Sequence, residues 1–177
     1  DLVYGGATIR RSEDQSLESR AQQNIEGKRA IGKLASELVQ DAEMIFIDCG
    51  TTCFEMRHYL KAKRGLTIIL NSTLLATELG ENNDFSIIVL GGNYRHDRMD
   101  AIGPLAVNAI DQLRGYIAFI GVDGLDMEFG LSASDIQTAH LYQHVMKNAR
   151  ESILLADRTK FLAPSLYRIG DIENVSR

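Results

Sequence analysis

The segment Met44–Cys53 (MIFIDCGTTC) is the part of the sequence from which the fold can be predicted. Residues 44–47 form a short apolar run with two isoleucines, which is typical of a buried strand. The run ends at Asp48, and Gly50, Thr51 and Thr52 follow before a segment with a helical pattern. The first N–H groups of a helix lack intrahelical partners and carry partial positive charge. A strand, a tight loop and a helix start therefore predict a loop that can hold a phosphate.

The same order of elements recurs along the chain. Strand-length apolar runs lie at residues 44–47, 66–70, 85–90, 116–120 and 152–156, with a short further run at 166–169. Helical patterns lie between them, at residues 21–40, from 51 to about 60, and at 74–79, 105–113 and 135–150. We interpret residues 93–100 as a charged loop, and a second loop as reaching Ser134, a possible cap for the last long helix. This alternation predicts a Rossmann-like α/β fold, a mainly parallel sheet with helices on both faces.

Composition narrows the function classes. The 177 residues are 45% hydrophobic and 24% charged, which is ordinary for a globular domain. No apolar run approaches the ~20 residues of a membrane span, and no signal peptide is visible. The 19 Lys and Arg against 24 Asp and Glu give a net charge of −5, which argues against this domain gripping a nucleic-acid backbone. The two cysteines form neither a disulfide framework nor a CxxC motif, so we expect a cytoplasmic protein. Because no membrane span is predicted, we expect no membrane partner.

We expect two regions in this chain. Residues 1–20 carry Gly5-Gly6 and a polar run, and we interpret them as an N-terminal arm or linker. Residues 21–177 are enough for a single domain with its own core. The chain opens at Asp1, and we expect it to be a fragment of a longer protein.

Polar or glycine-rich residues follow every predicted strand of the main series. In a parallel sheet, ligands bind beyond the carboxyl ends of the strands. The segments at those ends are 48–52, 71–73, 91–92, 121–124 and 157–160. Five such ends in one chain predict a ligand site at this edge.

The order of these motifs resembles a known family. The segments IFIDCGTTCFEM (45–56), NSTLLATEL (71–79), VLGGNYR (89–95), GPLA (103–106), AFIGVDGL (118–125) and LLADRTKF (154–161) are similar to those of the effector-binding domain of DeoR-type bacterial repressors of carbohydrate catabolism. The resemblance spans most of the chain, from about Tyr4 to about Phe161. It implies a fold related to ribose-5-phosphate isomerase and glucosamine-6-phosphate deaminase, adapted to sense a sugar phosphate. It also implies a separate N-terminal helix-turn-helix domain, absent from this fragment, that binds operator DNA and responds to the effector.

One segment departs from the family pattern. Members commonly carry a Glu-Ala pair and then Lys-Arg in the long helix, where this chain has residues 138–143, TAHLYQ. Neutral side chains replace charged ones, which points to a different effector.

The candidate effector-binding residues are Asp48, Gly50, Thr51, Thr52, Asn71, Ser72, Thr73, Gly91, Gly92, Arg95, Gly121, Asp123 and Lys160. Several have a purely structural alternative, since Gly50, Thr51, Thr52 and the triplet at 71–73 are also helix-capping residue types. Asp48 could likewise be a loop carboxylate and Asp123 an Asx-turn residue. Arg95 is preferred over His96 and Arg98 as the cation of the charged loop, and Lys160 is selected only by its motif.

Two other features are weaker. His140 and His144 share a helix face, as metal ligands can, but no third ligand follows from the spacing, and we predict no metal and no cofactor. Cys49, beside a helix start, could be a thiol of lowered pKa, but a small buried side chain is the preferred interpretation.

The leading hypothesis is a sensor domain and not an enzyme, with no catalytic residues. Its predicted partners are a phosphorylated sugar, a second or further copies of the chain as a dimer or tetramer, and operator DNA through the missing domain only. The alternative is a sugar-phosphate isomerase or amino-sugar-phosphate deaminase of the same architecture, with Asp48, Asp123 or Asp157 as general base.

Overall fold

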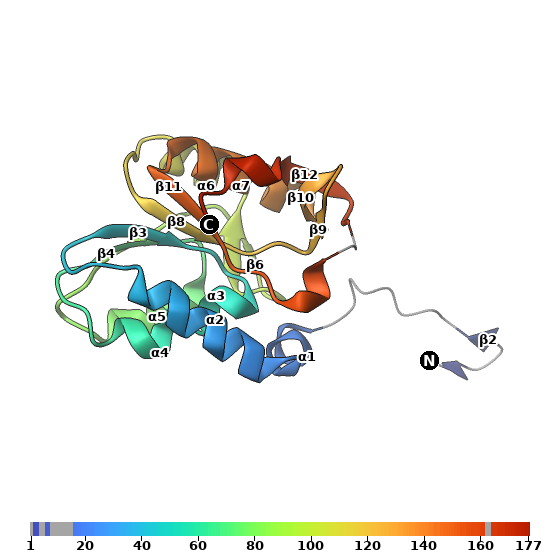
Figure 1. The fold of residues 1–177 in the computed structure, drawn as a ribbon, viewed down its shortest axis with the longest axis horizontal. Helices are drawn as coiled ribbons and strands as arrows, with labels where there is room; N and C mark the ends of the chain where they lie inside the picture. Colours follow the sequence, from blue (N-terminus) through green and yellow to red (C-terminus); the bar gives the residue numbers. More distant parts are fainter. Residues whose placement is uncertain (1, 4–5, 8–15, 162–163) are drawn as a thin grey trace.

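The computed structural model describes residues 2–3, 6–7, 16–161 and 164–177. Its centre is a five-stranded sheet in the order β11-β8-β3-β4-β5, and all four neighbouring pairs are parallel (Figure 1). The strands are β3 (Met44–Ile47), β4 (Thr67–Leu70), β5 (Ser86–Val89), β8 (Ile117–Ile120) and β11 (Glu151–Leu154). The predicted fold class, a mainly parallel α/β sheet, is confirmed.

The segment Met44–Cys53 begins with the central strand of this sheet. Ile45 pairs with Ile68 of β4 on one side and with Ile117 of β8 on the other. Ile45, Phe46 and Ile47 are fully buried because helices cover both faces, so the strand is apolar throughout and does not alternate.

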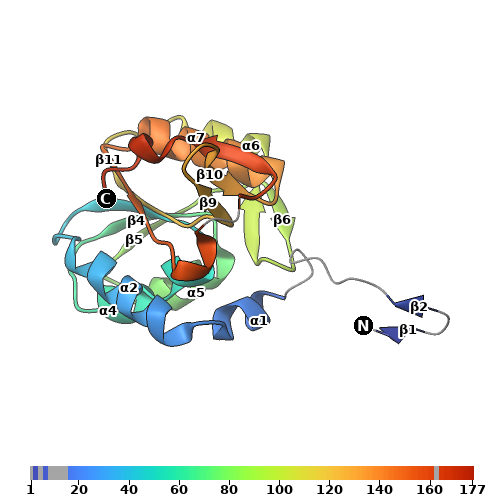
Figure 2. The same cartoon turned by 45° about the vertical axis from the view of Figure 1, so that its right-hand side comes forward.

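Two sets of helices cover the two faces (Figures 1 and 2). One face is covered by α2 (Ile25–Glu37), α3 (Thr51–Phe54), α4 (Arg57–Leu60) and α5 (Thr73–Gly80), and the other by α6 (Pro104–Ile110) and α7 (Ile136–Asn148). Each face has its own apolar cluster, one around Ile45 and Leu75 and the other around Phe46 and Leu141. In the described part of the chain, no helix is both long enough and apolar enough to cross a bilayer.

Smaller elements complete the fold. β9 (Gly124–Asp126), β10 (Gly130–Ala133) and β12 (Tyr167–Gly170) form an antiparallel sheet in the order β12-β10-β9, and β6 (Asn93–Arg95) pairs with β7 (Asp100–Ile102) as a hairpin. The strand predicted at 166–169 is thereby confirmed within one residue. The remaining elements are the strand pair β1 (Leu2–Val3) and β2 (Gly6–Ala7), the helix α1 (Leu17–Gln22) and the short turns η2 (Arg158–Lys160) and η3 (Ile172–Asn174).

Two predicted helices were wrong in their extent. The helix expected over 21–40 is two helices, because Asn24 takes a left-handed conformation (φ 53°, ψ 41°) that interrupts the helix between α1 and α2. The helix expected after Thr51 is divided into α3 and α4.

Two predicted loops were also wrong. The charged segment 93–100 contains β6 and the start of β7, and the loop before Ser134 contains β9 and β10. These strands lack a long apolar run, and their pairing comes from contacts that the local pattern does not reveal. The cap of α7 is Asp135, whose Oδ1 accepts the N–H of Thr138 at 2.7 Å, and not Ser134.

Candidate functional site

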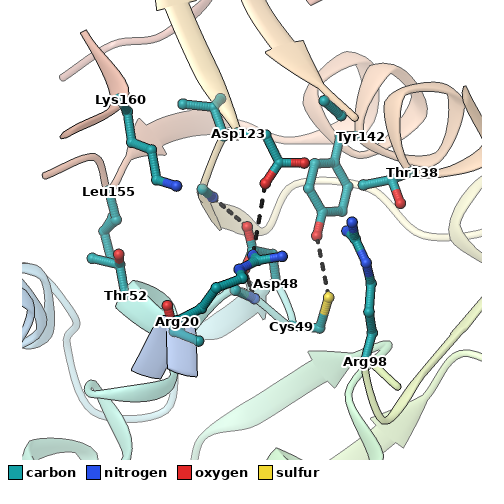
Figure 3. Close-up of a pocket in the computed structure, with 15 residues that line it drawn as sticks. Arg20, Asp48, Cys49, Thr52, Arg98, Asp123, Thr138, Tyr142, Leu155 and Lys160 are labelled. Atoms are coloured by element: carbon teal, nitrogen blue, oxygen red, sulfur yellow. Dashed lines mark hydrogen bonds and ion pairs between the residues drawn. The ribbon is translucent and has the colours of Figure 1, made fainter. Parts of the chain in front are cut away.

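A cavity of about 40 Å³ lies at the carboxyl ends of β3, β8 and β11 (Figure 3). Its lining residues come from six separate parts of the chain: Arg20, Asp48, Cys49, Gly50, Thr51, Thr52, Arg98, Gly121, Val122, Asp123, Ala133, Thr138, Tyr142, Leu155 and Lys160. Seven of the predicted residues are among them: Asp48, Gly50, Thr51, Thr52, Gly121, Asp123 and Lys160. A second, larger hollow lies between Pro104, His140 and Tyr167, away from the strand ends and without a comparable set of cations.

Asp48 holds two strand ends together. Its carboxylate accepts hydrogen bonds from the backbone N–H groups of Gly50 and Gly121, one on each oxygen. The side chain is buried, and burial raises the pKa of Asp48 despite the two backbone hydrogen bonds, which favour the ionised form. A Cβ at position 50 would lie 2.7 Å from Oδ1 of Asp48, so this close approach requires glycine.

The Gly50-Thr51-Thr52 loop presents hydrogen-bond donors to the cavity. Thr51 opens α3, and the glycine before it provides no side-chain cap. The first N–H groups of this turn have no partner within the helix. Both threonines are more than nine-tenths buried and line the cavity, so their hydroxyls can donate to an anion there.

Three cationic side chains border the cavity. Lys160 reaches it from η2, and its ammonium points toward the centre of the group in Figure 3. Arg98, from the turn between β6 and β7, donates to Oγ of Ser134 at 2.9 Å. Arg20, from α1, lies 3.6 Å from Asp123 (Nη2 to Oδ1). The cavity therefore has positive charge on more than one side.

Asp123 is the polar counterpart of these cations. Its Oδ2 accepts the backbone N–H of Ser134 at 2.9 Å and the Ser134 hydroxyl at 2.8 Å. Burial alone would raise the pKa of Asp123, but the hydrogen bonds from Ser134 and the charges of Arg20 and Arg98 outweigh burial and lower it. This carboxylate is held ionised, and its Oδ1 faces Arg20.

Cys49 and Tyr142 form another part of the wall. The Cys49 thiol donates to Oδ2 of Asp100 at 3.0 Å and lies 3.7 Å from the Tyr142 hydroxyl (Figure 3). Burial, together with the nearby carboxylates of Asp100 and Asp48, raises the pKa of Cys49 well above its usual range. The alternative of a thiol with a lowered pKa is therefore wrong.

Four of the predicted site residues that lie outside this cavity have structural contacts. Ser72 caps α5, since its Oγ accepts the N–H of Leu75 at 3.2 Å. The Thr73 hydroxyl donates to the Met99 carbonyl at 2.8 Å, and the Asn71 carbonyl accepts the N–H of Ala101 at 2.8 Å. Gly92 has φ 147°, and a Cβ there would collide with the carbonyl of Ile102. These contacts tie the ends of β4 and β5 to the β6–β7 hairpin.

Gly91 and Arg95 also lie outside the cavity. Gly91 is exposed, and nothing would touch a Cβ at that position. Arg95 forms a two-pronged ion pair with the fully buried Asp100, with Nε to Oδ1 at 2.8 Å and Nη2 to Oδ2 at 2.6 Å. It also contacts Asp135 at 3.1 Å and the Thr138 hydroxyl at 3.1 Å, so it fastens the hairpin to the start of α7.

Sequence reasoning did not select eight of the lining residues: Arg20, Cys49, Arg98, Val122, Ala133, Thr138, Tyr142 and Leu155. A signal existed for Thr138 and Tyr142, which are four residues apart on α7 within the segment that departs from the family pattern. No local pattern pointed to Arg20, which falls in the region interpreted as an arm.

The histidine pair on α7 does not form part of this site. The rings of His140 and His144 are 4.8 Å apart, and Nδ1 of His144 lies 2.9 Å from the Asp111 carboxylate. Across the described residues, no three His, Cys, Asp or Glu side chains are grouped so as to hold a metal ion.

The fold places the chain in the class of ribose-5-phosphate-isomerase-like α/β domains. A ribose-5-phosphate isomerase solved in complex with phospho-erythronic acid superposes with a TM-score of 0.56 at 18% identity, over 78% of this chain and 54% of that chain. Ribose 5-phosphate isomerase A from Neisseria gonorrhoeae gives a TM-score of 0.54 at 17% identity, over 78% of this chain and 54% of that chain. At this level of identity the likeness concerns the fold alone.

Sequence comparison then identifies the family. The model of the DeoR C terminal sensor domain matches residues 23–177, and the chain belongs to this family. It is 30% identical to the HTH-type transcriptional regulator GolR of Listeria innocua, over 98% of this chain and 69% of that protein. The Glycerol-3-phosphate regulon repressor of Escherichia coli K12 is 28% identical, over 97% of this chain and 69% of that protein.

A third relative agrees with these. The Putative aga operon transcriptional repressor of Escherichia coli O157:H7 is 28% identical, over 98% of this chain and 66% of that protein. The chain thus spans about two thirds of the length of these relatives. The predicted family, and with it the ligand-sensing role of the domain, is confirmed.

Proposed function

We propose that the cavity at the strand ends binds a phosphorylated sugar, and that its occupancy controls DNA binding by an N-terminal helix-turn-helix domain. The observation that carries the proposal is the convergence of the Gly50-Thr51-Thr52 loop with three cations, Arg20, Arg98 and Lys160, on one cavity. Backbone N–H groups, hydroxyls and a small number of cations are the groups that proteins use to hold phosphate.

The residues divide naturally between the two parts of such a ligand. Thr51, Thr52 and Lys160 are the phosphate ligands in this proposal, and Asp123, an ionised acceptor, takes a sugar hydroxyl. Arg98 replaces Arg95 as the cation that the β6–β7 hairpin contributes, because Arg95 is already committed to Asp100. Thr138 and Tyr142 provide neutral contacts on the opposite wall.

The cavity is partly open to solvent, and the space inside it that water can occupy is about 40 Å³. We propose that the side chains around it shift when a whole sugar phosphate binds. Binding that selects the shifted arrangement is the differential affinity that any regulatory effect requires.

The relatives support the regulatory part of the proposal. Their names are those of transcriptional regulators, among them the Glycerol-3-phosphate regulon repressor. We propose that an N-terminal arm within residues 1–20 links a DNA-binding domain to a sensor domain of residues 21–177, to whose cavity Arg20 of α1 also contributes. We further propose that the protein acts in the cytoplasm as a dimer or tetramer, since two-fold symmetric operators call for symmetric proteins.

The enzyme alternative has less support. A general base must be free to take a proton from the substrate. Both oxygens of Asp48 accept a backbone N–H, and Asp157 accepts the N–H of Thr159 at 2.7 Å. The pKa of Asp123 is lowered by the hydrogen bonds from Ser134 and by the charge of Arg20, which makes this carboxylate a weaker base. We propose that the chain is not an enzyme, and we expect no turnover of ribose 5-phosphate, fructose 6-phosphate or glucosamine 6-phosphate.

A thermal-shift screen tests the proposal. Each sugar phosphate is compared with its unphosphorylated sugar and with free phosphate. A ligand at 100 times its Kd stabilises the fold by about 2.7 kcal/mol, and this shift should be largely lost in Thr51→Ala/Thr52→Ala. Thr77→Ala, an exposed threonine on α5, is the matched control and should keep the shift. The binding proposal fails if no sugar phosphate raises Tm, and the non-enzyme proposal fails if turnover is sustained and disappears with Asp123→Asn.

A further inference from the structure

Three contacts attach helix α1 to the domain near the cavity. None of its residues, Leu17–Gln22, is buried. A six-residue helix without a buried face has little packing energy of its own and opens easily. It packs chiefly against α3, the short helix that begins at Thr51.

A buried lysine provides a second attachment for α1. Lys28 on α2 is only 4% exposed, and its ammonium donates to the backbone carbonyl of Arg20. Burial lowers the pKa of Lys28, with Lys160 and Arg20 acting in the same direction and Asp157 and Glu55 opposing them. The hydrogen bond from Lys28 fixes the backbone of α1 at Arg20, and the side chain of Arg20 reaches the cavity.

The third attachment is the Arg20 side chain itself. It is 24% exposed and extends from α1 to the cavity, where it lies 3.6 Å from Asp123 (Figure 3). The guanidinium has five N–H donors in a planar fork, and Asp123 uses only its Oδ1 for this pair. Among the described residues, Asp123 is the acidic partner of the Arg20 guanidinium, which therefore has donors to offer an anion in the same cavity.

We propose that Arg20 is a ligand-binding residue, and that α1 is thereby stabilised when an anion occupies the cavity. The inference rests on the proposed anion site and adds the route by which occupancy is transmitted. The Arg20 guanidinium then contacts both Asp123 and the bound phosphate, and it gains charge-assisted hydrogen bonds in addition to the ion pair at 3.6 Å. All three attachments of α1 then converge on the occupied site. Residues 1–15 precede α1 in the chain, and α1 is the helix through which they join the domain.

Hydrogen exchange on the whole 177-residue chain tests this inference with inorganic phosphate as the probe and chloride at equal ionic strength as the reference. The amides of Arg20 and Gln23, which donate to the carbonyls of Ser16 and Ser19, report on α1. We expect phosphate to slow their exchange several-fold. The amides of α5, on the same face of the sheet but away from the cavity, should not change.

Two variants separate ligand contact from helix attachment. Arg20→Gln should weaken phosphate binding about tenfold, the loss expected for a charge-assisted hydrogen bond, and should abolish the response of α1. Lys28→Met keeps the side-chain volume but removes the bond to the Arg20 carbonyl. It should make α1 exchange faster than in the unchanged chain, and phosphate should still slow that exchange because Arg20 is present. Because α1 and the anion stabilise each other, phosphate affinity should fall as well, but by less than in Arg20→Gln. Lys33→Gln, an exposed cation on α2, is the control and should behave like the unchanged chain.

The outcomes distinguish this inference from the proposed function. If phosphate protects residues 50–54 but leaves α1 unchanged, or if Arg20→Gln binds phosphate as well as the unchanged chain does, Arg20 does not have this role and the proposed site still stands. If phosphate protects neither segment and no sugar phosphate raises Tm, both the site and the role of Arg20 are refuted.

Discussion

The carboxylate of Asp48, at the end of β3, accepts the backbone N–H of Gly121, at the end of β8. The other oxygen of the same carboxylate accepts the N–H of Gly50. One buried side chain thus fixes the loop that opens α3 relative to the neighbouring strand. The floor of the cavity depends on this bond.

Replacing Asp48 with Asn should lower the free energy of unfolding by about 1–3 kcal/mol, because an amide has one oxygen where two N–H groups need acceptors. Its NH₂ group would face one of those donors in a buried place. Urea denaturation measures the loss. Asp97→Asn, an exposed carboxylate in the β6–β7 turn, serves as the control and should leave stability unchanged. An Asp48→Asn protein as stable as the original would show that the two backbone bonds are unimportant.

The ion pair between Arg95 and the fully buried Asp100 predicts a structural role for Arg95. Arg95→Ala leaves a buried carboxylate without its cation, which should cost about 3–5 kcal/mol of stability. Arg98→Ala is the informative comparison, since Arg98 lines the cavity. It should change the unfolding midpoint little and reduce the Tm shift caused by a sugar phosphate. The opposite assignment of the two arginines would follow if Arg95→Ala were stable and lost ligand response instead.

Ser72 tests capping against ligand contact. Its Oγ accepts the Leu75 N–H at the start of α5, so Ser72→Ala should cost about 1 kcal/mol of stability. The ligand-induced Tm shift should be retained, because Ser72 does not line the cavity. Ser72→Thr, an uncharged capping residue type, should recover most of the stability. If the ligand no longer raised the Tm of Ser72→Ala, Ser72 would be a ligand-binding residue after all.

Asp123 predicts a pH dependence. Its pKa in the folded chain is lowered from the ordinary 3.8, so the unfolded chain binds the proton more readily. The stability that Asp123 contributes is therefore complete above about pH 5 and is lost as the pH falls below 3.8 through the folded value. Denaturation midpoints measured from about pH 5 to about pH 3 should fall less steeply for Asp123→Asn than for the unchanged chain. Equal slopes would mean that the hydrogen bonds from Ser134 and the charge of Arg20 do not hold the carboxylate ionised.

The sequence by itself determined the central sheet. Runs such as residues 66–70 and 116–120 are too short for a helix and rich in isoleucine, which favours strands buried on both faces. The helical patterns between them favour parallel crossover connections. The polar residues at the strand ends could be located because each apolar run stops at them. Whether a residue is apolar is a local property, so the pattern of apolar residues was enough to predict the strands.

Only the tertiary structure decided which strand ends share the cavity. The sheet order places β8 and β4 on either side of β3, but Ser72 forms a bridge with Asp100, and the β6–β7 hairpin occupies the end of β4. The cavity is therefore built from β3, β8 and β11. Arg20 joins it from a helix more than twenty residues before β3 because Lys28 and Asp123 hold it there. Such contacts between distant segments depend on the order of the strands and on pairwise electrostatics, and neither is encoded in a local run of residues.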